Sequence, residues 1–135
     1  MGIFKTFKAY TDIEQSKKLA EILPIKSADM CYVRAYFEGK NSDWFIQLGR
    51  PIKSDDVIPA WALSALLQVL PLGIYDEFDG CDYELEINMI DKMPRYIRLG
   101  DIYHSQFPYD FEKDTLLDNI VESIIWLNDN NYFEL

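Results

Sequence analysis

An acid-rich stretch, Asp76-Glu77-Phe78-Asp79-Gly80-Cys81-Asp82, has residue types that could bind calcium. Calcium prefers oxygen ligands, and an EF-hand loop needs an aspartate at its start, a glycine at its sixth position and a glutamate at its end. With Gly80 at the glycine position, Glu86 takes the closing position, but Tyr75 falls where the first aspartate must be. The stretch therefore predicts a solvated turn that enters a strand, and no metal site.

Histidine and cysteine chemistry is restricted by the small number of these residues. His104 is the only histidine, which excludes a zinc site built on two imidazoles. Cys31 and Cys81 are isolated from each other in sequence, which indicates reduced thiols in a cytoplasmic protein and not a disulfide framework. We expect Cys31 to be an inert thiol on the core face of a strand, and His104 to lie in a strand at the edge of a sheet. Neither cysteine lies in a sharp glycine-flanked turn, so catalysis through a Cys-His pair is not expected.

Catalysis by two carboxylates needs one acid that burial keeps protonated. The acids that the pattern can place, Glu84, Glu86, Asp118 and Glu122, fall on predicted solvent faces. The glycines are scattered, and none precedes a Lys-Ser or Lys-Thr pair as in a phosphate-binding loop. The sequence thus contains no recognisable catalytic constellation, and we expect a protein that is not an enzyme and has no cofactor or metal.

Two aromatic features favour binding over chemistry. Tyr32, Arg34 and Tyr36 alternate along a predicted strand on the face away from the core, where such a row could contact a partner or form a cross-strand ladder. Trp126 falls on the polar side of the last predicted helix. An exposed indole is typical of interfaces, unless the tail Tyr132-Phe133 folds back over it. Trp126, Tyr32, Arg34 and Tyr36 are therefore the predicted binding residues.

The elements that position these residues begin with a helix over about 11–23, capped by Thr11 and Glu14 and ended by Pro24. A β-hairpin follows, with alternating residues over 31–37, a turn over 39–43 and a second strand over 44–48.

The next predicted element after the hairpin is a buried helix over 60–70, with Trp61 in the core. Pro59 suits the first position of this helix. Strands are predicted over 82–89, 95–99 and 102–107, the first two joined by a turn at Lys92-Met93-Pro94. The last helix runs over about 115–128, with Thr115 and Asp118 in capping positions and Asn119 and Ser123 on its polar face.

The order of elements is thus α-ββ-α-βββ-α. It predicts an α+β fold with an antiparallel sheet of about five strands and helices packed on one face. No linker or repeat divides the chain, and its 135 residues are near the commonest domain size, so a single domain over 1–135 is expected.

The charge is unevenly distributed along the chain. The formal net charge is −10. Residues 1–70 are nearly neutral, whereas 71–135 hold only Lys92, Arg95, Arg98 and Lys113 against fifteen acids. Negative charge repels phosphates, so neither direct nucleic-acid binding nor a membrane partner is expected. A basic protein partner remains compatible with the charge.

Three segments carry a resemblance to a known group: Ser27-Ala28-Asp29-Met30, the run from Ile58 to Leu67, and Asp118 to Glu122 with Ile125-Trp126-Leu127. On these residues, the chain resembles small uncharacterised proteins encoded in phage and mobile elements of anaerobic gut bacteria. The resemblance implies an intracellular accessory role and carries over no reaction and no catalytic residues.

Two functions follow as hypotheses. The first is a noncatalytic protein-interaction module, which binds a protein partner or itself through the hairpin face or the Trp126 surface. The alternative is an acidic inhibitor or decoy, whose second half mimics a nucleic-acid backbone and blocks a basic host protein.

Overall fold

The computed structural model describes residues 7–98, 106–107, 111 and 113–133. Internal contacts divide the described residues into an N-terminal unit, 9–69, and a C-terminal unit, which holds residues 7–8 and the described residues from 70 to 133. The expectation that the whole chain is a single domain stays a prediction. No helix within the described residues combines the length and the apolar character that crossing a bilayer requires.

The first helix, α1 (Ile13–Ala20), is shorter than expected and starts from a different cap. The carboxylate of Asp12 accepts the N–H of Gln15 at 2.8 Å, and the Gln15 side chain accepts the N–H of Asp12 at 3.1 Å. The predicted capping box of Thr11 and Glu14 is therefore wrong by one residue. Thr11 is buried, and its hydroxyl accepts a backbone N–H from a segment fifty residues later instead of capping the helix.

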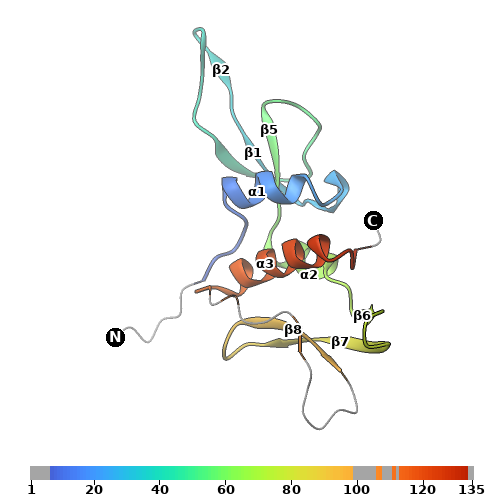
Figure 1. Cartoon of the computed structure of the whole chain (residues 1–135). Helices are drawn as coiled ribbons and strands as arrows, with labels where there is room; N and C mark the ends of the chain where they lie inside the picture. Colours follow the sequence, from blue (N-terminus) through green and yellow to red (C-terminus); the bar gives the residue numbers. More distant parts are fainter. Residues whose placement is uncertain (1–6, 99–105, 108–110, 112, 134–135) are drawn as a thin grey trace. The chain divides into compact units, whose positions relative to one another are not determined.

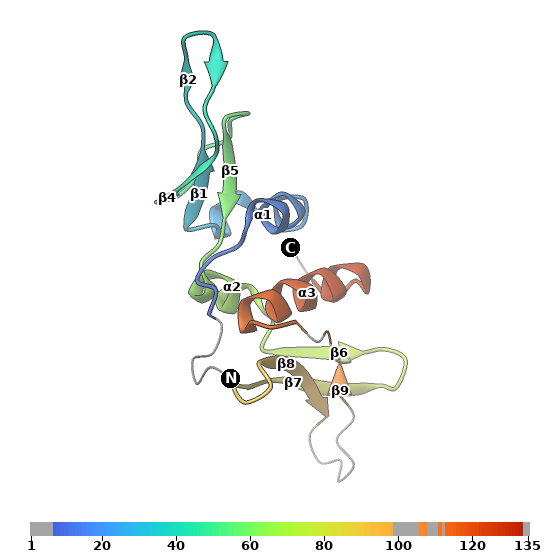
Figure 2. The ribbon, with the colours of Figure 1, turned by 90° about the vertical axis from the view of Figure 1, so that its left-hand side faces the viewer.

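The N-terminal unit contains a three-stranded antiparallel sheet in the order β4-β1-β5. The strands are β1 (Met30–Val33), β4 (Phe45–Leu48) and β5 (Val57–Ala60). Strands β1 and β4 confirm the predicted hairpin, which continues past the sheet as β2 (Tyr36–Phe37) and β3 (Lys40–Asn41) (Figures 1 and 2). The predicted turn over 39–43 is wrong, because residues 40–41 already pair with β2 and the chain reverses at residues 38–39. Helix α1 packs against β5.

Strand β5 occupies the place where the sequence predicted the start of a helix. The Asp56 carbonyl accepts the N–H of Arg34 at 3.2 Å, which directs the backbone groups of even-numbered residues in β5 toward β1. The nitrogen of Pro59 therefore faces the outer edge, the position in a sheet that tolerates proline. The prediction that Pro59 begins the helix is wrong, and α2 (Leu63–Val69) starts three residues later than Ala60.

One hydrophobic cluster of the N-terminal unit lies on one face of this three-stranded sheet. Its buried residues are Met30, Tyr32, Ile58 and Ala60, and the partly buried residues packed against them are Tyr10, Ile13, Trp44, Ile46 and Ala62. Trp61 is fully buried, as predicted, and its indole N–H donates to the Ser27 hydroxyl at 3.0 Å. The buried indole therefore has a polar partner, as its desolvation requires.

The C-terminal unit contains a four-stranded antiparallel sheet in the order β6-β7-β8-β9. The strands are β6 (Gly73–Asp76), β7 (Cys81–Asn88), β8 (Met93–Arg98) and β9 (Gln106–Phe107). Strand β7 confirms the clearest predicted strand. The acid-rich stretch over 76–82 runs from the last residue of β6 through a turn at 77–80 into β7, as predicted.

Three details of this sheet differ from the prediction or lie beyond it. The sequence did not predict strand β6, because this strand is only four residues long and continues directly into the acidic turn. The predicted turn at Lys92-Met93-Pro94 ends at Lys92, whose φ is 60°, and Met93 already belongs to β8. The predicted strand at 102–107 is described only over its last two residues, and His104 lies outside the described residues.

Helix α3 (Leu116–Asp129) confirms the last predicted helix and its cap. The Thr115 hydroxyl accepts the N–H of Asp118 at 3.1 Å. The helix lies over the sheet of the C-terminal unit, against β8 (Figures 1 and 2). Its buried apolar residues are Leu117, Ile120, Val121, Ile124 and Leu127.

Asn119 and Ser123 were predicted on the polar face of α3, but both are fully buried. The Asn119 amide donates to the carbonyl of Lys92 at 2.8 Å and to that of Lys113 at 3.3 Å. Its oxygen accepts the N–H of Lys113 at 3.1 Å. The placement of Asn119 on a solvent face was wrong because these backbone partners compensate the burial of its amide, which a helical wheel cannot show. The Ser123 hydroxyl is buried without a hydrogen-bond partner among the described residues.

The fold class is α+β, as predicted, with three α-helices and antiparallel sheets among the described residues. The strands belong to a three-, a two- and a four-stranded sheet instead of one sheet of about five. Within each unit, a helix covers a sheet: α1 in the N-terminal unit and α3 in the C-terminal unit.

Candidate protein-binding site

The hairpin beyond the three-stranded sheet, residues 36–41, is called the hairpin arm. Its strands β2 and β3 pair antiparallel, with Phe37 opposite Lys40. Glu38 and Gly39 form the turn with φ values of 51° and 78°. Two positive φ values are typical of the two-residue hairpin turn that matches strand twist, and Gly39 adopts its value without steric strain.

A change of register separates the arm from the sheet. Between the two ladders, Arg34 and Ala35 on the first strand face three residues on the second, so the second strand has one extra residue. Ser42 holds this bulge: its N–H donates to the Ala35 carbonyl at 2.7 Å, and its hydroxyl accepts the Ala35 N–H at 2.8 Å. Because a bulge bends and twists a hairpin, these bonds fix the direction in which the arm leaves the sheet.

Arg34 anchors the base of the arm. Its Nε donates to the Asp56 carboxylate at 3.1 Å, and its guanidinium lies over the Trp44 ring, 4.6 Å from the centroid. The guanidinium thus has two partners within the N-terminal unit, a carboxylate and an aromatic ring. Of the predicted binding residues, Arg34 has a positioning role between the sheet and the arm.

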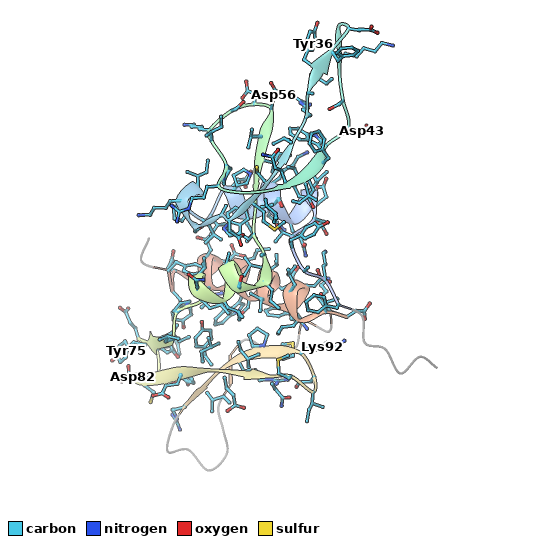
Figure 3. The ribbon with its side chains drawn as sticks, turned by 180° about the vertical axis from the view of Figure 1, so that it is seen from behind. Tyr36, Asp43, Asp56, Tyr75, Asp82 and Lys92 are labelled. Atoms are coloured by element: carbon cyan, nitrogen blue, oxygen red, sulfur yellow. The ribbon has the colours of Figure 1, made fainter. Side chains whose placement is uncertain are left out.

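The aromatic residues of the arm are exposed. Tyr36 and Phe37 keep 72% and 73% of their surface accessible. As neighbours on a strand, they point to opposite faces of the arm. Figure 3 shows the Tyr36 side chain on the arm, with Asp43 and Asp56 nearer its base. The predicted position of Tyr36 away from the core is confirmed. Phe37, which the predicted alternation over 31–37 puts on the same face as Cys31, is equally exposed.

Tyr32 does not belong to this surface. It keeps only 8% of its surface accessible and lies in the core of the N-terminal unit. Its hydroxyl donates to the Thr11 carbonyl at 2.7 Å. The predicted assignment of Tyr32 to the face away from the core is wrong. The hydrogen bond to Thr11 satisfies the phenol hydroxyl, so the side chain can be buried. Cys31 is also buried, and burial raises the pKa of its thiol, which disfavours the reactive thiolate.

Trp126 is half-buried on α3, and Tyr132 stacks on it. The ring centroids are 5.4 Å apart with an interplanar angle of 22°. The tail therefore folds back over the indole, the alternative that the sequence left open. The phenol of Tyr132 is also near the Asp76 carboxylate, at 3.4 Å. Burial, with this carboxylate as a lesser cause, raises the pKa of Tyr132.

A polar cluster at the start of β7 was not predicted. The Tyr83 hydroxyl donates to the Asp79 carboxylate, which lowers the pKa of Asp79. Burial, reinforced by that bond, raises the pKa of Tyr83 to about 12. Beside them, a guanidinium nitrogen of Arg98 donates to the Cys81 sulfur at 3.4 Å. These polar groups satisfy one another's hydrogen bonds and fix the turn. In the described part of the chain, no group of three side chains that could hold a metal ion is found.

The outer face of β7 is acidic. Asp82, Glu84 and Glu86 are exposed at alternate positions of the strand and so project from one face of the sheet. Tyr75 of β6 is opposite Asp82 in the register, and Figure 3 shows these two side chains together at that end of the sheet. The predicted solvent-facing position of Glu84 and Glu86 is confirmed.

No protein-family model, no curated protein and no solved structure matches this chain.

Proposed function

We propose that this chain is a noncatalytic protein-interaction module that contacts its partner through the hairpin arm. The observation that carries this proposal is the exposure of Tyr36 and Phe37 on a short two-stranded arm, to which the described residues add no third strand. An aromatic side chain left in water forgoes roughly 1.5–3 kcal/mol of burial free energy. Aromatic residues are enriched at protein interfaces, and tyrosine is among the residues that most often dominate the binding energy.

The construction of the arm supports the same proposal. The bulge bonds of Ser42 and the contacts of Arg34 hold the base, while the two aromatic residues beyond it remain accessible. A backbone that is fixed in place before binding loses less conformational entropy when the partner arrives. The proposed setting is a cytoplasmic accessory protein of phage or mobile-element origin.

The test is affinity capture from lysate with the wild-type chain and the double variant Tyr36→Ser/Phe37→Ser. We expect a partner protein that the double variant binds at least about a hundredfold more weakly, which corresponds to about 2.8 kcal/mol. The control is Met89→Ser/Ile90→Ser, which removes two exposed apolar side chains from a turn of the C-terminal unit. Equal capture by the arm variant would refute this proposal.

The acidic outer face of β7 favours a second candidate function, an acidic decoy for a basic nucleic-acid-binding protein. Alternate residues of a strand are about 6.8 Å apart, so Asp82, Glu84 and Glu86 present a regular row of negative charge. A partner held by this row is expected to be lost at high salt and in Asp82→Asn/Glu84→Gln/Glu86→Gln. A partner held by the hairpin arm should survive both changes.

A further inference from the structure

Strand β4 is an edge of the three-stranded sheet, whose order is β4-β1-β5. Among the residues that the structure describes, no strand pairs with its outer side, which is called the open edge. A strand edge offers unpaired N–H and C=O groups to any further strand that arrives. What the edge can accept therefore depends on which groups point outward and on the side chains beside them.

The hydrogen bonds to β1 decide which groups point outward. The N–H of Gly49 donates to the Asp29 carbonyl at 3.1 Å, which makes that pair a hydrogen-bonded position of the ladder. Such positions alternate along an antiparallel pair, so Gln47 and Phe45 also direct their backbone groups toward β1. Ile46 and Leu48 must then present their N–H and C=O groups to the open edge.

The two edges of this sheet differ in protection. Proline, charge and bulges are the usual devices that keep an edge strand from pairing. Strand β5 carries Pro59, whose nitrogen faces outward and offers no donor. Strand β4 has the sequence Phe-Ile-Gln-Leu, without charge or proline, and Leu48 keeps 80% of its surface accessible. The open edge is therefore competent for pairing.

The charges next to β4 are complementary to those of a second, antiparallel β4. Residues 44–49 carry no charge, and the strand is bracketed by Asp43 and Arg50, both exposed. In an antiparallel pair, Asp43 of one copy lies at the same end as Arg50 of the other, so opposite charges meet at both ends. A parallel pair would bring like charges together at each end.

We propose that β4 pairs antiparallel with β4 of a second copy of this chain, about a two-fold axis at Gln47. In this register, Ile46 of each copy lies opposite Leu48 of the other, and both residues offer outward backbone groups. The two residues of each such pair exchange two hydrogen bonds, so the two pairs together form about four hydrogen bonds between the copies. It also covers Leu48, and it joins two three-stranded sheets into one of six strands.

This self-association goes beyond the proposed partner-binding function, because it uses the edge of the sheet and leaves the hairpin arm free. The register ends at Gly49, whose φ of 113° departs from the extended conformation of a strand. The contact is small, so the dimer should form only at raised protein concentration.

The test is sedimentation velocity of the full chain over a range of concentrations. We expect a monomer that becomes a dimer, and at least a tenfold weaker dimer for Leu48→Lys, because the added ammonium would lie against the second copy. The control is Leu72→Lys, an equally exposed leucine of the C-terminal unit, which should dimerise as the wild type does. A monomer at every concentration, or a dimer unchanged in Leu48→Lys, would contradict the proposal.

A charge exchange tests the antiparallel register independently. Asp43→Arg alone and Arg50→Asp alone should each weaken the dimer, because each puts like charges at both ends of the pair. The double variant Asp43→Arg/Arg50→Asp should restore it. A double variant as weak as the singles would overturn the register, and the arm variant Tyr36→Ser/Phe37→Ser should dimerise normally whether or not it binds a partner.

Discussion

The hydroxyl of Tyr32 donates a 2.7 Å hydrogen bond to the backbone carbonyl of Thr11, and it ties β1 to the chain segment before α1. This bond separates Tyr32 from Tyr36, although both lie on the same side of the predicted strand. Tyr32→Phe should lower the free energy of unfolding by about 1–2 kcal/mol, because the buried carbonyl loses a partner. Urea unfolding measures the change, and Tyr36→Phe should leave the midpoint unchanged.

Asn119 is a fully buried polar side chain of α3. Its amide makes three hydrogen bonds to the backbone of Lys92 and Lys113. Asn119→Ala should destabilise the chain by about 2–3 kcal/mol, because buried backbone groups lose their partner. Asn128→Ala is the matched control, since that asparagine is exposed on the same helix. Equal losses in the two variants would contradict the account of Asn119.

The phenol of Tyr83 should make stability depend on alkaline pH. Its pKa is raised to about 12 in the folded chain, against about 10 for an unfolded tyrosine. The folded state therefore holds the phenolic proton more tightly, and this contribution is present below about pH 10 and is lost as pH rises through about 12. Tyr83→Phe should lose less stability than the wild type over this interval. Chemical unfolding at a series of pH values measures the slope, and identical slopes would refute the assignment.

The variant Trp126→Ala tests whether the Trp126 surface, the second predicted binding surface, contacts the partner protein. Because Tyr132 stacks on the indole, Trp126→Ala should lower stability by roughly 2 kcal/mol or more through lost packing. It should leave partner capture unchanged once the variant is assayed at a temperature where it is folded. Capture that is lost in Trp126→Ala and kept in Tyr36→Ser/Phe37→Ser would move the binding site to α3.

The predictable parts of the fold are those that local chemistry decides. Helix α3 follows from the Thr115 cap and the 3.6-residue spacing of its apolar side chains, and β7 follows from strict alternation. Pro59 was ambiguous, because proline is accepted both at a helix start and at the outer side of an edge strand. Only the pairing of β5 with β1 distinguishes the two.

The candidate site was predictable in part. Tyr36 followed from alternation, but the same alternation put Phe37 on the face of Cys31, because a strand pattern does not reveal where the sheet that covers it ends. Tyr32 was assigned to the exposed face, because a strand pattern also does not reveal that a distant segment covers that face. Cys31 and Tyr32 are both buried, and the Thr11 carbonyl that satisfies the phenol comes from a distant segment. The partners of Asn119 are likewise set by tertiary structure.

The most direct test of the hairpin arm is site-specific photo-crosslinking in cells. A photo-reactive phenylalanine analogue replaces Phe37 in one variant and Ile90, an equally apolar and exposed residue, in the other. The proposed function predicts a discrete adduct with a partner protein from position 37 and none from position 90. No adduct from position 37, or the same adduct from both positions, would contradict a role of the hairpin arm in binding.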